Sequence, residues 1–288
     1  MSELTKKDRI ALVILCYNSA DEIEELLKNL KKTESNYFSI VVDNASDIVD
    51  REKLTGLEID HIIILPNNMG FAAGNNVGIR YAKEQGFEYI AVMNSDIELI
   101  QDNTLKSLKD TLVNESADFV GPKMKNEYGQ TVSGKIITNK YGDCFFGETE
   151  KAGNAESVTG ALFLFRTSIL DKVGYMEEKF FLYREETEYF IRAKRMGADI
   201  YYDTKIEIIH KCGSTTGIRS NYYLIRNGMH IARSLYHTPE VMIRLYYIRK
   251  HWKSVLRVLF HYHDVDYDKM IVRGIKDGIK KVYGKLVE

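Results

Sequence analysis

The stretch YIAVMNSDIEL (residues 89–99) joins an apolar run to a group of polar side chains. Residues 89–93 form the continuous apolar pattern that is typical of a strand covered on both faces. An amide, a hydroxyl and a carboxylate follow at Asn94, Ser95 and Asp96, and apolar alternation then resumes at Ile97. Polar groups at the end of a buried strand indicate either a turn or a ligand site.

The same pattern occurs three times earlier in the chain. Apolar runs at 10–16, 38–42 and 62–65 each end at polar residues, and helical periodicity follows at 19–30 and 75–85. This alternation predicts an α/β fold with a Rossmann-like, mostly parallel, doubly wound sheet. Ligands bind outside the carboxyl ends of the strands in such sheets, so the four polar ends predict one cleft. The polar ends are Tyr17-Asn18, Asp43-Asn44-Ala45-Ser46, Asn67-Asn68 and Asn94-Ser95-Asp96.

The second half of the chain has a mixed pattern. The Gly- and Tyr-rich stretch 126–154 is expected to be irregular, and residues 157–170 predict a strand that runs into a helix. Residues 185–197 predict a helix closed by Gly197, and residues 199–210 predict one or two strands. Helical pattern continues from residue 221, without a linker or repeat. We therefore expect a catalytic domain over 1–217 and an integral helical extension over 218–288.

Composition places the chain among ordinary globular proteins, with 288 residues, 44% hydrophobic and 28% charged. Its three cysteines, Cys16, Cys144 and Cys212, have no CxxC spacing, which suits a reducing compartment. The N-terminal residues are polar, and no run reaches the roughly 18 apolar residues of a spanning helix. A cytoplasmic protein is expected. Residues 216–288 hold 14 Lys/Arg against 6 Asp/Glu, so a basic tail follows an acidic body.

Several strand-end residues have two interpretations. Asp43 is placed to accept from a base N–H or a ribose hydroxyl, or to form an Asx turn or a helix cap. The segment 67–79 contains Gly70, Gly74 and Gly78 but not GxGxxG, so its glycines serve a close backbone approach or simple turn and cap chemistry. Asp96 suits a hard divalent cation bound to a diphosphate, which needs only one or two protein oxygens. His210 is either a further ligand or a core residue.

Three acids, Glu185, Glu186 and Glu188, lie at the start of the predicted 185–197 helix. They either complement the helix dipole, at roughly 0.3–1 kcal/mol each, or supply a general base for an attacking hydroxyl. Adjacent helical positions differ by about 100°, so Glu185 and Glu186 cannot both face one site.

Taken together, these segments resemble a family 2 glycosyltransferase of the inverting GT-A type. The likeness is greatest to bacterial rhamnosyltransferase-like members that build surface polysaccharides, and it spans about residues 9–230. It rests on VILCYN (13–18), VVDNAS (41–46), NNMGFAAGNNVGI (67–79), MNSDIEL (93–99), VTGALFLFRTSILDKVGYMEEKFFLYREETEYFIRAKRMG (158–197), IIH (208–210) and YYLIRN (222–227).

The resemblance implies roles at matching positions. Asn94-Ser95-Asp96 matches the DxD segment of the family, so Asp96, completed by His210, would hold Mn²⁺ or Mg²⁺ against the donor diphosphate. Glu186 matches the catalytic base of the family, and Glu185 would be the base if the match is shifted by one residue. The chain departs from the family pattern at two positions. Asn94 stands where the DxD segment has its first acid, and Glu186 stands where the family has an aspartate as the base. The remaining implied positions are Tyr17, Asn18, Asp43, Asn67, Gly70, Asn75, Asn94 and Ser95 on the donor nucleotide side, and Gly160 and Ala161 on the acceptor side.

The resemblance implies a metal-dependent hexosyltransferase that transfers a sugar with inversion. Its donor would be a dTDP- or UDP-sugar, with a rhamnose-type donor favoured, and its acceptor a hydroxyl of a glycan or lipid-linked molecule. One alternative is a glycosyltransferase-like protein that binds nucleotide with little turnover. Another is a sugar-phosphate nucleotidylyltransferase, but CYNSADE (16–22) lacks the basic residues expected of its phosphate loop.

The tail carries an amphipathic pattern over 241–259. Val241, Leu245, Ile248, Trp252, Val255 and Leu259 share one helical stripe, with Lys250, Lys253 and Arg257 roughly opposite. Such a helix packs on the catalytic body, forms a homodimer interface, or lies on anionic lipid at the inner face of the plasma membrane. Nothing in the chain resembles a nucleic-acid recognition module, so no nucleic-acid partner is expected.

Overall fold

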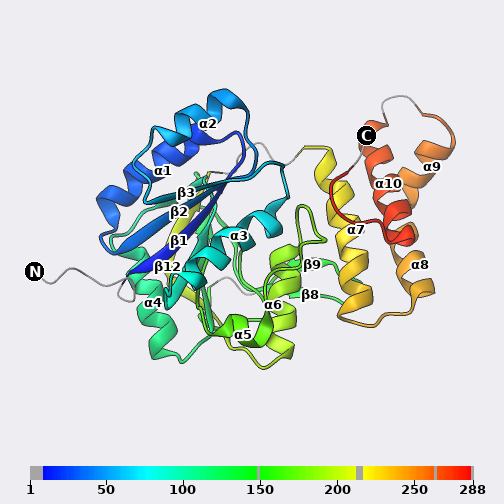
Figure 1. The fold of residues 1–288 in the computed structure, drawn as a ribbon. Coiled ribbons are helices and arrows are strands. Elements are labelled where there is room, and N and C mark those ends of the chain that lie inside the picture. The colour runs from blue at the N-terminus through cyan, green and yellow to red at the C-terminus, as the bar shows by residue number, and fades with distance from the viewer. Residues whose placement is uncertain (1–8, 148–149, 212–216, 263–264, 287–288) are drawn as a thin grey trace, which may run out of the picture.

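The computed structural model describes residues 9–147, 150–211, 217–262 and 265–286. Helices cover both faces of one large sheet, and the last four helices form a separate layer at one end (Figure 1). The strands are β1 (Ile10–Cys16), β2 (Tyr37–Asp43), β3 (His61–Ile64), β4 (Tyr89–Met93), β5 (Ile97–Leu99), β6 (Phe119–Lys125), β7 (Thr131–Ser133), β8 (Ile136–Thr138), β9 (Cys144–Phe146), β10 (Gly153–Asn154), β11 (Leu162–Arg166) and β12 (Ile200–His210). The helices are α1 (Ala20–Thr33), α2 (Ile48–Thr55), α3 (Phe71–Glu84), α4 (Thr104–Asn114), α5 (Ile169–Val173), α6 (Glu185–Arg195), α7 (Arg219–Ser234), α8 (Glu240–Lys250), α9 (Trp252–Leu259) and α10 (Asp266–Lys280).

Strand β1 is central and buried on both faces, as its unbroken apolar run predicts. Successive side chains of a strand point to opposite faces. Leu12 and Ile14 belong to the core formed with α1 and α4, whereas Ala11 and Val13 belong to the core formed with α3, α5 and α6. The predicted α/β class is therefore confirmed.

The sheet is mostly parallel, with β12 and β6 running in the same direction as β4, β1, β2 and β3. Its spatial order is β10-β12-β6-β11-β4-β1-β2-β3, and β4, β1, β2 and β3 are parallel. Strand β11 runs antiparallel between β4 and β6, which makes the sheet mixed. The short β5 pairs antiparallel with β12, placing Ile97 opposite His210. This pairing joins two segments that lie far apart in the sequence.

Several sequence-based boundaries need correction. The helix predicted from residue 75 begins at Phe71. The stretch predicted to be irregular, 126–154, contains four short strands, β7 to β10. Residues 200–210 form one strand, with a register shift between Asp203 and Glu207. Cys212 lies outside the described residues.

The C-terminal helices have a small core of their own, in which Met229 of α7, Ile243 and Tyr247 of α8, and Ile271 of α10 are buried. The single helix predicted over 241–259 is divided at His251 into α8 and α9. Of the alternatives left open for its apolar stripe, packing on the protein body is not what the structure shows. All members except Val255 are between 41% and 65% exposed, because α8 is buried instead through Ile243 and Tyr247.

Candidate active site

A cleft of about 400 Å³ lies at the carboxyl ends of β1, β2 and β4. Five of the predicted site residues, Tyr17, Gly70, Asn94, Ser95 and Asp96, line it. The expectation that the polar strand ends share one cleft therefore holds for all four ends, because Asn44 and Asn68 also line it. We call this cavity the strand-end cleft.

Asp96 and His210 meet in this part of the molecule. Oδ2 of Asp96 lies 2.9 Å from Nε2 of His210, and both side chains are partly exposed. The β5–β12 pairing fixes this approach, together with a hydrogen bond of 2.9 Å from the Lys211 N–H to the Asp96 carbonyl. The N–H of Asn94 also donates to the carbonyl of Ala161 at 2.9 Å, which ties the segment to β11.

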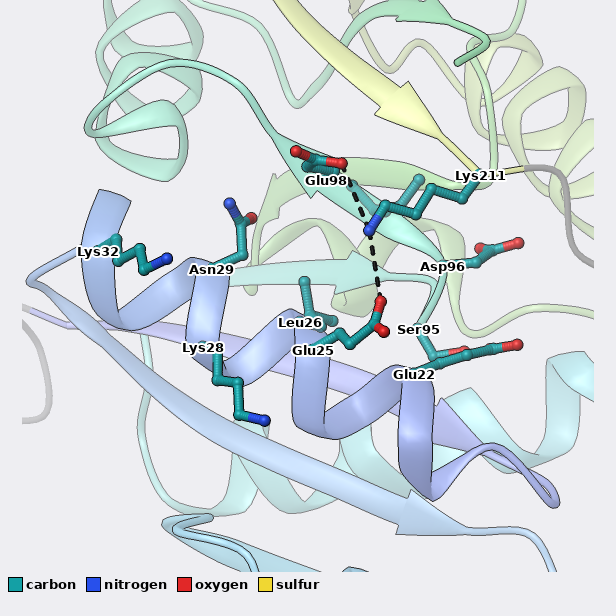
Figure 2. A pocket seen from close by; sticks show the side chains of 11 residues that line it. Glu22, Glu25, Leu26, Lys28, Asn29, Lys32, Ser95, Asp96, Glu98 and Lys211 are labelled. Atoms are coloured by element: carbon teal, nitrogen blue, oxygen red, sulfur yellow. Dashed lines mark hydrogen bonds and ion pairs between the residues drawn. The ribbon is translucent and has the colours of Figure 1, made fainter.

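Two residues beside Asp96 were not foreseen from the sequence. Ser95 donates from its Oγ to the Glu22 carboxylate at 2.7 Å, and Glu22 also lines the strand-end cleft. Figure 2 shows Glu22 and Asp96 pointing to the same side. Lys211 lies 3.4 Å from the carboxylates of both Glu25 and Glu98 (Figure 2). The acidic first turn of α1, directly after a polar strand end, was the signal for Glu22.

Asp43 is fully buried and does not line the cleft. Its carboxylate accepts from the Ser46 N–H and from Arg51, each at 2.8 Å. The bond to the N–H three residues on is a local turn contact rather than an Asx turn, and a contact with a nucleoside stays a prediction. Asn44, the next residue, lines the cleft instead and donates to Asn68 at 3.1 Å. Three more predicted donor-side residues also lie outside the cleft lining: Asn18, Asn67 and Asn75.

Gly70 shapes one edge of the cleft. Its φ is +86°, and a Cβ there would lie 2.3 Å from the carbonyl oxygen of Phe181. The N–H of Phe71 donates to that same oxygen at 2.8 Å. Glycine is required because no other residue tolerates both the left-handed backbone and the close approach. The 67–70 loop and the 181–182 segment therefore meet across the cleft.

A second cavity, of about 330 Å³, is lined by Gly160, just before β11, and by Glu186. We call it the glutamate cavity. Glu186 is partly exposed and lines it, whereas Glu185 is only 3% exposed and does not. The predicted divergence of the two side chains is thus observed. A Cβ at Gly160 would lie 2.7 Å from the Glu186 Cγ, so the glycine makes room for this side chain. Ala161 is buried behind it.

The two cavities are neighbours along the backbone. Leu182 lines the strand-end cleft and the next residue, Tyr183, lines the glutamate cavity. The hydrogen bond between Asn94 and Ala161 also connects the two regions. A molecule bound in the cleft and another in the cavity could therefore approach each other.

A model of the family described as "Glycosyl transferase family 2" matches residues 11–174, more than half of the chain. The chain belongs to this family.

Relatives of this glycosyltransferase extend the likeness to nearly the whole chain. The dTDP-rhamnosyl transferase RfbF of Shigella flexneri is 26% identical over 294 residues, covering 96% of this chain and 97% of its own. The low-salt glycan biosynthesis hexosyltransferase Agl10 of Haloferax volcanii is 26% identical over 296 residues, covering 98% of this chain and 94% of its own.

A solved structure supports the fold assignment. The mannosyltransferase PcManGT of Pyrobaculum calidifontis, crystallised with GDP-Man and Mn²⁺, superposes with a TM-score of 0.57 at 10% identity. The match covers 95% of this chain and 87% of that one. The glycosyltransferase therefore has the GT-A fold that its sequence predicted. In the part of the chain that the structure describes, no helix is long and apolar enough to cross a bilayer.

The donor set at Asp96 fits a divalent ion only in part. Carboxylate oxygen and imidazole nitrogen are suitable ligands for Mn²⁺, and the carboxylate also for Mg²⁺. Among the described residues no group of three or more His, Cys, Asp or Glu could hold a metal ion. Asp96 and His210 would therefore need further oxygens from a bound diphosphate and water. Such sparse protein coordination is usual where a cation accompanies a phosphate substrate.

The glutamates of α6 lie in a strongly perturbed environment. Burial raises the pKa of the Glu186 carboxyl, and the positive charge of Arg184 opposes that shift. Burial and the neighbouring Glu186 charge raise the pKa of Glu185 well above its usual range. Glu188 is different, because it pairs with Arg192 at 2.9 Å and lies outside the glutamate cavity. Glu186 is thus the member of the trio with access to a ligand.

The turn before Glu186, at Tyr183 and Arg184, has a strained backbone and is held by hydrogen bonds from α7. Tyr183 and Arg184 have φ of +65° and +75°, a left-handed conformation that is costly for residues other than glycine. Asn227 holds this turn, donating to the carbonyls of Leu182 at 2.9 Å and Tyr183 at 2.7 Å. Strain of this kind gathers at functional sites. Helix α7 is therefore part of the active-site scaffold.

Proposed function

We propose that this glycosyltransferase moves a sugar, with inversion, from a dTDP- or UDP-sugar to an acceptor hydroxyl. A rhamnose-type donor is favoured, and the acceptor is a glycan or lipid-linked molecule in polysaccharide synthesis. The observation that carries the proposal is the arrangement of two carboxylates. Asp96, beside His210, opens into the strand-end cleft, and Glu186 opens into the adjoining glutamate cavity.

The strand-end cleft suits a nucleotide. Tyr17, Phe71 and Phe181 provide aromatic walls, and amide side chains of Asn44 and Asn68 lie among them. Aromatic faces with a few placed polar groups are the usual lining of a small-molecule site. The name of the relative RfbF, a dTDP-rhamnosyl transferase, supports a dTDP-sugar, and the GDP-Man in PcManGT supports a nucleotide-sugar in general.

Asp96 and His210 would hold Mn²⁺ or Mg²⁺ at the diphosphate end of the donor. A bound ion would offset the negative charge that develops on the departing nucleoside diphosphate. Asn94, in place of an acid, contributes an uncharged amide to the same wall. The Mn²⁺ in the PcManGT structure supports a divalent ion without identifying which one.

Glu186 would act as the general base. Its carboxylate takes the proton of the acceptor hydroxyl as that oxygen bonds to the anomeric carbon, and the bond from that carbon to the diphosphate breaks. Attack from the face opposite the leaving group inverts the anomeric centre. The raised pKa of Glu186 strengthens it as a base, and Glu185 lies too deep in the protein to reach an acceptor.

A nucleotide screen with matched variants tests this function. We expect dTDP or UDP to raise the melting temperature in the presence of Mn²⁺, because a ligand that binds only the folded state stabilises it. Asp96→Asn should abolish the metal-dependent part, and Glu186→Gln should retain it. Donor turnover should fall about 10²- to 10⁴-fold in Glu186→Gln. Glu52→Gln, at an exposed position on α2, is the control.

The alternative of a nucleotide-binding protein with little turnover predicts a different outcome. It predicts nucleotide stabilisation of the wild-type chain without release of nucleoside diphosphate from any donor and acceptor pair. The same result would overturn the proposed catalytic role of Glu186. The cytoplasmic location expected from the sequence remains part of the proposal.

A further inference from the structure

The outermost helices of the C-terminal layer expose a large apolar stripe. Val241 and Leu245 of α8 and Trp252 and Leu259 of α9 are 65%, 62%, 52% and 65% exposed, and helical spacing places each pair on one side of its own helix. No residue of α9 is buried. Large apolar side chains gathered in this way usually mark an interaction surface. We call this surface the α8–α9 face.

The body of the protein does not cover this face. Helix α8 packs on α7 and α10 through Ile243 and Tyr247, so its exposed stripe lies on the other side. Figure 1 shows α8 and α9 at the outer edge of the molecule, on the side away from the large sheet. The stripe is therefore free to contact a partner.

The charge of the segment restricts what that partner can be. Residues 241–262 contain five Lys or Arg and no Asp or Glu. Arg244, Lys250 and Arg257 are paired with acids from outside the segment. For Arg249 and Lys253, no ion pair occurs within the described residues, and Lys253 lies 5.8 Å from the ring centroid of Trp252. The segment thus combines apolar side chains, an indole and basic groups. Such a combination is complementary to a partner that has both an apolar layer and negative charge.

The α8–α9 face is connected to the glutamate cavity through the β8–β9 hairpin. Lys250 of α8 contacts Asp143 at 2.5 Å, immediately before β9. Ile137 and Phe145 lie opposite each other in the hairpin, on one side of it, and are 50% and 54% exposed. Phe145 also lines the glutamate cavity. Exposed apolar groups therefore occur both on the hairpin that lines the glutamate cavity and on α8, which contacts the loop of that hairpin.

We propose that the α8–α9 face docks on a bilayer surface that contains anionic lipid. The stripe enters the headgroup boundary and the basic residues meet the lipid charge, which brings the glutamate cavity to the membrane, where a lipid-linked acceptor would reside. A second copy of the chain fits less well, because a two-fold interface would oppose two basic segments that contain no acid. The purpose of docking rests on the proposed function, whereas lipid binding itself does not.

Flotation of the full chain with lipid vesicles tests the docking surface. We expect binding to vesicles of phosphatidylglycerol and phosphatidylcholine, weak binding to phosphatidylcholine alone, and loss of binding at high salt. Leu245→Glu with Leu259→Glu should weaken partition about 100-fold, since two apolar side chains no longer enter the lipid. Arg249→Gln with Lys253→Gln should weaken it about 30-fold, at roughly fivefold per charge.

Matched controls separate a specific surface from general stickiness. Ile48→Glu with Val49→Glu changes two residues that are 71% and 73% exposed on α2, and should leave partition unchanged. Because all these positions are exposed, circular dichroism should be the same for every variant. Donor turnover with a water-soluble acceptor should also persist in the Leu245→Glu, Leu259→Glu protein, so a failure of catalysis and a failure of docking are distinguishable.

Two outcomes would overturn the proposal. One is a wild-type protein that does not float with anionic vesicles, or that floats equally well after the Leu245→Glu and Leu259→Glu changes. The other is a stable dimer in solution, measured by light scattering, that these two changes dissociate. The second result would assign the face to another copy of the chain.

Discussion

Substitution of Gly160 by alanine should disturb catalysis through Glu186. The added Cβ would lie 2.7 Å from the Glu186 Cγ and 3.0 Å from its Cβ. Carbon atoms in contact prefer about 3.5–4.0 Å, so the glutamate must retreat by about 1 Å. A misplacement of about 1 Å in a catalytic group can cost about 10²-fold in rate. We expect kcat to fall by about that factor in Gly160→Ala.

The assay is release of nucleoside diphosphate from the donor that the nucleotide screen identifies, measured with acceptor at saturation. The KM for the donor should change little, because the strand-end cleft is not altered. Gly56→Ala on the edge of α2 is the control, since a Cβ there would meet nothing closer than 3.4 Å.

A double-mutant cycle then tests the cause. In a Glu186→Ala background the alanine at 160 has no carboxylate to displace and meets only the Cβ at 3.0 Å, so it should cost much less than in the wild-type background. Full activity in Gly160→Ala would refute the reasoning. An equal loss in both backgrounds would also refute it, because the glycine would then act independently of Glu186.

Three further predictions concern the surroundings of the site and the sheet. Arg184→Met removes a positive charge that lowers the pKa of Glu186, so the acid limb of the kcat/KM profile should move to higher pH. An acid limb at the same pH as in the wild type would show that Arg184 does not influence the titration of Glu186. Asn227→Ala leaves two carbonyls of the strained turn without their donor and should reduce the free energy of unfolding by about 2 kcal/mol in urea titration. Burial raises the pKa of Glu34 to about 7, against an opposing hydrogen bond from the Leu105 N–H, so the folded protein holds a proton that the unfolded chain loses above about pH 4.5. Stability therefore falls as pH rises towards 7, and Glu34→Gln should raise the melting temperature at pH 8 but not at pH 4; equal effects at both would contradict this.

Strands β1 to β4 were predictable because they carry unbroken apolar runs. Hydrophobic periodicity reports burial directly, and the runs around β1 and β4 have no competing interpretation. The hairpin of β8 and β9 was missed for the opposite reason. Its strands have three residues each, too few to establish alternation, and the contacts of α8 with Asp143 beside β9 join residues far apart in the sequence.

The site was predicted at the level of segments better than at the level of side chains. The approach of Asp96 to His210 was expected from the family resemblance, whereas the β5–β12 pairing that causes it could not be read from local pattern. At the end of β2 the residue that lines the cleft is the one after Asp43, and the predicted contact of Asp43 with a nucleoside is untested. Asp43 turns inward to Arg51 and Asn44 lines the cleft, because successive strand residues point to opposite sides.

The exposure of the C-terminal apolar stripe could not be predicted from helical periodicity. Helical spacing identified Leu245, Trp252 and Leu259 as one apolar stripe, but it could not show that the helix is divided at His251 or that these side chains would be exposed. Coverage depended on where α7 and α10 pack, and they occupy the side that carries Ile243 and Tyr247.

The contacts of α7 also bear on how acceptor preference could be re-engineered. Through Leu224 this helix forms part of the glutamate cavity, and through Asn227 it holds the backbone ahead of α6. A chimera joined to a relative directly after β12 would replace α7. It would therefore exchange both the residue that lines the glutamate cavity, Leu224, and the residue that holds the turn before α6, Asn227. A junction after residue 235 would exchange only the outer helices, so hybrids built there should keep native turnover and acquire the attachment site of their new tail.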